Sequence, residues 1–148
     1  MEQLIFDSGI KEYQINGKGV LRFNPSDPNV YARFVDAMPK IEQIEKEMAE
    51  KAGKIGREAE KAGESILMVM RETDRKIKAE LSAVFGGDND FDRILEGVNL
   101  MAVASNGERV IGNLINALLP IMENGAKICV RAEVDEAKLN REQRRAMQ

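Results

Sequence analysis

The chain has 148 residues, of which 32% are charged and only 5% are aromatic. That balance is typical of a single domain of amphipathic helices and argues against a β-sandwich or barrel. The net charge is −3, so no general attraction to nucleic acid or to an anionic membrane is expected. No apolar run approaches the roughly 20 residues that span a bilayer.

Cysteine and histidine usage limits the chemistry further. Cys129 is the single cysteine and histidine is absent, so no intrachain disulfide can form and the commonest general base and transition-metal ligand is missing. A lone thiol fits a reducing cytoplasm. The start of the chain, residues 1–7, lacks the basic segment of a secretory signal. We therefore expect a cytoplasmic protein that is not an enzyme and needs no cofactor or metal.

Residues 10–23 predict a β-hairpin, because Asn16-Gly17 lies between two short alternating runs. A three-residue loop, residues 16–18, pairs Tyr13 with Leu21 and gathers the apolar side chains on one face, whereas a two-residue loop splits them. The apolar pattern favours the three-residue loop. Residues 4–6 could add a short third strand. Since a two-stranded hairpin is barely stable alone, it must pack on helices.

Residues 28–85 carry an apolar stripe with steps of three and four, which predicts helix. Ser26 or Asp27 can cap it, and Pro28 suits its first position. Pro39 and three glycines argue for interruptions, and we place a break or a weak exposed stretch at residues 53–56. The predicted helices are 28–52 and 57–85. They form either an antiparallel αα-hairpin or a longer helix that pairs with a second chain.

The remainder predicts two further helices after the Gly86-Gly87 loop. A short helix at 90–96 is capped by Asp90, and an apolar helix at 108–124 contains Pro120 and fills the core. Residues 128–134 fit a strand or a helix equally. Residues 1–137 thus make one mainly α (α+β) domain, and residues 138–148 have the polar composition of a disordered tail.

No catalytic arrangement stands out among the polar residues. Asp88, Asp90 and Asp92 alternate near glycines, but they lack the glycine and closing glutamate of a calcium loop. Cys129 lies among apolar residues and is expected to be a buried, inert thiol. The arginines of residues 141–145 are expected to be a solvated tail. The eight methionines are core filler or an adaptable surface for a partner helix.

Several segments resemble a group of small phage and prophage proteins of Clostridia and related Firmicutes. The matching segments are the run from Lys11 to Asn16, the run from Val20 to Asp27, Val84-Phe85-Gly86, and residues 97–107 followed by an apolar helix at 113–122. The resemblance covers most of the chain up to about residue 125. These motifs look structural, so the resemblance implies no active-site residue.

Such proteins are similar in size and character to the tail assembly chaperones of long-tailed phages, which coat the tape measure protein during tail assembly. The resemblance implies a homo-oligomeric protein that binds the tape measure or another tail protein, and neither nucleic acid nor membrane. The alternative is a structural virion component that self-assembles. The predicted partner-binding residues lie on the first helical stripe: Phe34, Met38, Ile41, Ile44 and Met48. The alternative role of this stripe is plain intramolecular core.

Overall fold

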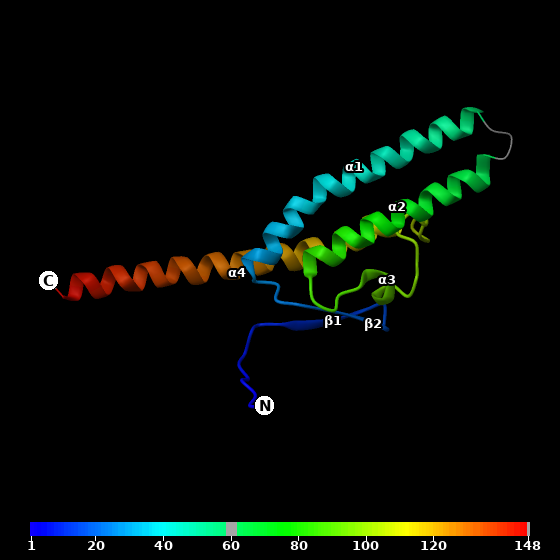
Figure 1. Ribbon diagram of the computed structural model, residues 1–148. Helices are drawn as coiled ribbons and strands as arrows, with labels where there is room; N and C mark the ends of the chain where they lie inside the picture. The colour runs from blue at the N-terminus through cyan, green and yellow to red at the C-terminus, as the bar shows by residue number, and fades with distance from the viewer. Residues whose placement is uncertain (59–61, 148) are drawn as a thin grey trace.

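A computed structural model describes residues 1–58 and 62–147 (Figure 1). Two strands, β1 (Lys11–Ile15) and β2 (Gly19–Phe23), precede two long helices, α1 (Pro28–Glu58) and α2 (Ala62–Phe85). A single-turn helix, α3 (Phe91–Ile94), and a long helix, α4 (Val110–Ala146), follow. The fold is mainly α with one β-hairpin, as predicted, and the hairpin packs against the helices.

The hairpin has the predicted three-residue loop, because Tyr13 pairs with Leu21 and Ile15 pairs with Gly19. Asn16 and Gly17 both adopt positive φ, which is why this dipeptide suits the turn. The register places Leu21 and Phe23 on one face, where both are buried. The core formed there includes an aromatic row in which the Phe23 ring lies 4.7 Å from that of Phe85.

The stripe of residues 28–85 forms an antiparallel αα-hairpin, with α1 and α2 side by side along their length (Figure 1). Of the two alternatives predicted for residues 53–56, the break is wrong, since α1 runs without interruption to Glu58, and the exposed stretch is the one that fits. Gly53 and Gly56 are exposed there, and an added Cβ would touch nothing at either position. They weaken the helix without ending it. Residues 59–61 of the predicted helix 57–85 lie outside the described residues.

Two prolines lie inside helices, contrary to the expectation that Pro39 would interrupt its helix. Pro39 is within α1 and Pro120 is within α4. A helical proline leaves the carbonyl four residues earlier without its intrahelical donor. Both prolines are on exposed faces of their helices, and the carbonyl freed by Pro39 belongs to the exposed Val35, which water can reach. This placement is why both helices continue.

Helix α4 is much longer than predicted, because it continues past residue 124 through 128–134 and the expected disordered tail to Ala146. Asn124-Gly125 has the sequence of a helix end, but Gly125 is helical. A Cβ at Gly125 would lie 1.6 Å from the carbonyl oxygen of Pro25. Glycine is needed here because the helix packs against the backbone of Pro25. The glycine therefore marks a close contact between two segments, and the predicted end of the helix at residue 124 is wrong.

The expected third strand at residues 4–6 does not form. Residues 1–10 have no regular secondary structure, and they lead away from the hairpin to the N-terminus (Figure 1). Leu4, Ile5 and Phe6 are between 73% and 88% exposed. Their apolar character therefore contributes nothing to the core of the chain that carries them.

A buried lysine ties α2 to the segments that follow it. Lys78 is 5% exposed, and its Nζ lies 2.9 Å from Asp74 and 2.8 Å from Asp92. Asp74 also accepts a hydrogen bond from the backbone N–H of Leu100 at 2.7 Å. The hydrogen bond from Lys78 holds the pKa of Asp92 below its ordinary value. The Lys78 ammonium thus joins α2 to α3, and its partner Asp74 joins α2 to the loop before α4.

We expect Lys78→Met to lower the free energy of unfolding by about 3 kcal/mol, since it leaves the buried Asp74 carboxylate without its cation. Urea denaturation followed by circular dichroism measures the change. Lys76→Met is the matched control: Lys76 meets Glu72 on the surface at 3.7 Å, and such a pair contributes less than about 1 kcal/mol. Equal losses in the two variants would contradict this role of Lys78.

The same network predicts a pH dependence. A depressed pKa at Asp92 gives stability that is present above its ordinary pKa of 3.8 and is lost as the pH falls through the lower, folded value. The Lys78→Met variant should lose this part of the acid dependence. Urea midpoints compared at neutral pH and below pH 3.8 measure it.

Gly125→Ala and Gly112→Ala form a second matched pair on α4. The first places a methyl group against the Pro25 carbonyl, and we expect a loss of at least about 2 kcal/mol. At Gly112 an added Cβ would meet nothing within 4 Å, so alanine should stabilise the helix by about 0.5–1 kcal/mol. Thermal denaturation of both variants tests this, and a neutral Gly125→Ala would disprove the close contact.

Candidate interaction surfaces

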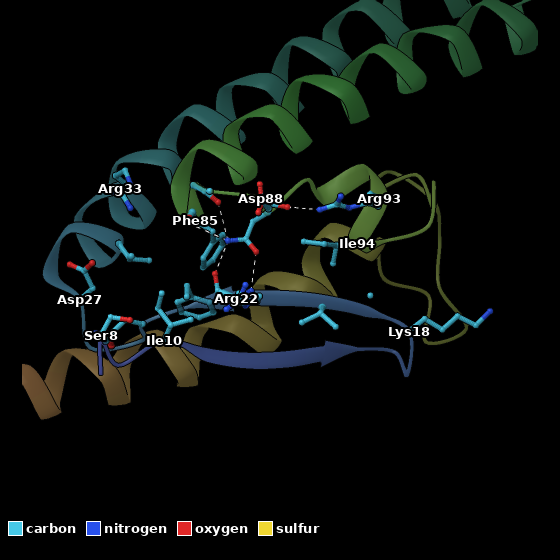
Figure 2. A pocket seen from close by; sticks show the side chains of 18 of the residues that line it. Ser8, Ile10, Lys18, Arg22, Asp27, Arg33, Phe85, Asp88, Arg93 and Ile94 are labelled. Atoms are coloured by element: carbon cyan, nitrogen blue, oxygen red, sulfur yellow. Dashed lines mark hydrogen bonds between the residues drawn. The ribbon is translucent and has the colours of Figure 1, made fainter. Parts of the chain in front are cut away.

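A groove of about 840 Å³ runs along the outer edge of β2. Figure 2 shows its walls: β2, the end of α2 with its loop, α3, the start of α1 and the segment before β1. Apolar groups line its floor and charged side chains stand at its rim. The apolar lining includes Ile10, Val20, Phe23, Val30, Phe85 and Ile94.

The side chain of Asn89 closes the middle of this groove. It is 7% exposed. Its Oδ1 accepts from the N–H of Arg22 at 2.9 Å, and its Nδ2 donates to the Arg22 carbonyl at 2.7 Å. Nδ2 also donates to the carbonyl of Gly86 at 3.0 Å. The amide satisfies both outward backbone groups of one residue of β2, as a neighbouring strand would.

The rest of the β2 edge is covered by α3. A Cβ at Gly19 would lie 2.0 Å from the carbonyl oxygen of Ile94, so α3 packs directly on the backbone of the strand. Asp90 caps α3 as predicted, with its carboxylate accepting from the N–H groups of Asp92 and Arg93. Asn89 at Arg22 and α3 at Gly19 therefore close the β2 edge to a further strand.

The charged groups at the rim are engaged in structural contacts. The Arg33 side chain donates to the Val84 carbonyl at 2.8 Å, and the Arg93 side chain donates to the Asp88 carbonyl at 2.6 Å. Arg33 therefore holds the last turn of α2, and Arg93 holds the loop that follows it. Within residues 1–58 and 62–147, no cluster of three or more carboxylates or thiols could hold a metal ion. The polar groups of this groove therefore connect β2, α1 and the end of α2 to one another.

The predicted partner-binding residues of α1 lie in the intramolecular core. Phe34, Ile41 and Met48 are buried, while Met38 and Ile44 are half-buried and pack against the same core. The structure brings the five together on one face, but that face is covered by α2 and α4. Their spacing is that of a core stripe, which is the alternative role left open by the sequence.

Two opposite charges, those of Glu45 and Arg109, lie near this stripe. Burial, with the nearby Glu42 carboxylate, raises the pKa of Glu45, and the Arg109 guanidinium acts in the opposite direction. Glu45 and Arg109 line the same shallow cavity beside Met38 and Ile41. The Arg109 side chain also donates to the Met101 carbonyl at 3.0 Å, so it fixes the turn before α4.

The distal part of α4 is an exposed surface that the predicted boundaries missed. Beyond residue 126 the helix projects from the body as a single rod (Figure 1). Cys129 is half-buried there, which corrects the expectation of a buried thiol. Four large apolar side chains on this rod are between 47% and 62% exposed: Ile128, Val130, Val134 and Leu139.

Part of this rod continues a stripe that begins in the core. Leu118 and Gly125 are buried and Ile121 is half-buried. The same spacing of threes and fours reaches Ile128 and Ala132, and Leu139 follows seven residues later. We call Ile128, Ala132 and Leu139 the α4 seam. Repeats of this kind mark helices that pair with other helices, and the period was readable in the sequence past Gly125.

Compared with known proteins, the chain matches no family model, no curated protein and no solved structure. The resemblance to small phage proteins therefore remains a prediction. Of the helices in the described part of the chain, none is long and apolar enough to cross a membrane.

Asn89→Ala should lower the free energy of unfolding by about 2–3 kcal/mol, because it leaves the N–H and C=O groups of Arg22 without partners inside the structure. Gln43→Ala is the control, since the hydrogen bond from its side chain to Glu47 is exposed and 3.3 Å long. It should change stability by less than about 0.5 kcal/mol. Urea denaturation measures both, and a neutral Asn89→Ala would contradict the role of this amide.

Proposed function

We propose that the protein is a non-enzymatic phage or prophage tail-morphogenesis protein, specifically a tail assembly chaperone that binds the tape measure protein in the host cytoplasm. One observation carries the proposal: the projecting part of α4, whose seam is exposed and which no other described part of the chain covers. The resemblance in residues 11–16, 20–27, 84–86 and 97–107 supplies the phage setting.

The physical fit rests on how helices pair. A partner helix can lie along Ile128, Ala132 and Leu139 and bury their apolar surface, at about 25 cal/mol for each Å² removed from water. The seam is short and broken by Asp135, so each contact is weak. A long helical partner would bind many copies of such a rod, and the combined binding would be strong.

The seam also has an internal control. Val130 and Val134 are as exposed as Ile128 and Leu139, but they lie on the other side of the helix, because two residues turn an α-helix by about 200°. A partner helix contacts one side. The two sides can therefore be compared by equal substitutions on one element.

The direct test is co-expression with the tape measure protein of the same prophage, followed by copurification and light scattering. We expect a soluble complex with many copies of this chain per tape measure. If the tape measure remains insoluble and this protein forms a closed ring alone, the chaperone function is wrong.

Ile128→Asp/Leu139→Asp should reduce recovery of the tape measure at least about tenfold, which corresponds to about 1.4 kcal/mol. Stability should change by less than about 0.5 kcal/mol, because these positions are exposed in the free protein. Val130→Asp/Val134→Asp is the control and should bind as the wild type does. Met48→Ala, by contrast, should lower the free energy of unfolding by about 2–4 kcal/mol, as expected of a core residue.

A self-assembling virion component is the second candidate, favoured by the N-terminal segment of residues 1–10, in which Leu4, Ile5 and Phe6 are exposed. Purified particles distinguish the two functions. A chaperone leaves after assembly, whereas a tail or head-completion protein remains in the particle and is detected there by mass spectrometry.

A further inference from the structure

We propose that residues 1–10, here called the N-terminal arm, add as a third strand to the free edge of β1 in a second copy of the chain. The arm and the edge of β1 are complementary, but within one molecule they do not pair with each other. The inference concerns self-assembly only, and it does not depend on the tape measure as a partner.

The edge of β1 is open, and the register shows which groups it offers. Both backbone groups of Arg22 face Asn89, away from β1. Its partner Glu12 must therefore point its own N–H and C=O away from β2, and Gln14 repeats this two residues later. Within the described residues nothing bonds to these outward groups. The hairpin thus has one closed edge, on β2, and one open edge, on β1.

The base of the arm is held in a direction that leads away from this edge. The Asn24 side chain, just after β2, donates to the Ser8 carbonyl at 3.1 Å. Gly9 has φ +75, and a Cβ there would lie 2.6 Å from the Asn24 amide nitrogen. The N–H of Gly9 also donates to the Asp7 carboxylate at 2.8 Å. These contacts tie the arm to the β2 side, so its own β1 edge stays free.

The arm has the pattern of the missing strand. Leu4 and Phe6 share one face of an extended segment, and Ile5 lies on the other. On β1, Tyr13 and Ile15 face the core but are only half-buried, because the sheet ends beside them. An arm from a second copy would place Leu4 and Phe6 next to these two side chains. It would bury the most exposed apolar segment of the chain and complete the sheet edge.

This contact is head-to-tail, since each copy gives an arm and accepts another. Repetition therefore produces a ring or an open chain, depending on whether the rotation closes. The unpaired backbone groups of an edge strand favour such additions. Every copy in a closed ring would have both its arm and its β1 edge occupied.

Light scattering after size-exclusion chromatography, over a range of concentrations, tests the proposal. The wild type should exceed the monomer mass. Leu4→Asp/Phe6→Asp should be monomeric without loss of stability, because both side chains are largely exposed in the free protein. Gln14→Pro should also be monomeric, because proline removes the outward N–H but no bond to β2. Glu12→Pro is a second edge variant, should Gln14→Pro fail to fold.

Mixing supplies the sharpest result. The arm variant, Leu4→Asp/Phe6→Asp, retains an intact β1 edge. The edge variant, Gln14→Pro, retains an intact arm. Equal amounts of the two should therefore form a 1:1 dimer and nothing larger, since only one productive contact is possible per pair. Neither variant should form this dimer alone. No association scheme that ignores the arm or the edge gives this outcome.

Leu67→Asp/Met68→Asp is the matched control, with two exposed apolar residues of α2 replaced, and it should keep the wild-type mass. The α4 seam variant should keep it as well. The proposal is overturned if the wild type is a monomer at every concentration, if the arm variant keeps the wild-type mass, or if the mixture does not dimerise.

Discussion

The fold depends on the side-chain amide of Asn89, which replaces a strand at the edge of a two-stranded sheet. A hairpin alone is marginal in water, and here one buried amide bonds to Arg22 of β2 and to the carbonyl of Gly86 beyond the end of α2. It therefore joins the sheet to the αα-hairpin. The Lys78 ammonium extends the connection from α2 to α3. With these contacts in place, Leu21, Phe23 and Phe85 close one core.

Local patterns were enough to predict the elements but not the contacts between them. The hairpin register followed from the alternation around Asn16-Gly17, and the αα-hairpin was one of two outcomes of the stripe. Asn89 was not predicted, because its partner Arg22 lies 67 residues away and nothing in the sequence links them. Gly125 was misinterpreted, since a glycine required by the Pro25 backbone looks the same as one that ends a helix.

The surface residues were harder to predict than the fold for the same reason. Phe34 and Met48 have the spacing of an interaction stripe, yet α2 and α4 cover them. The exposed seam at Ile128 repeats that spacing in a segment of polar composition. Whether an apolar stripe is exposed depends on whether another helix of the same chain packs against it, and the sequence alone does not show this. The N-terminal arm is the opposite case: its apolar residues predicted a strand, but Asn24 directs it away from its own sheet.

The contact between Gly125 and the Pro25 carbonyl has a mechanical consequence. It lies near the middle of a helix of 37 residues, about 55 Å long at 1.5 Å per residue. Helix α4 is thus a lever whose fulcrum is the junction between β2 and α1. A sideways load on the projecting end acts over about 30 Å and is transmitted as torque to that junction. A force on the rod is therefore transmitted toward the hairpin through the contact between Gly125 and the Pro25 backbone.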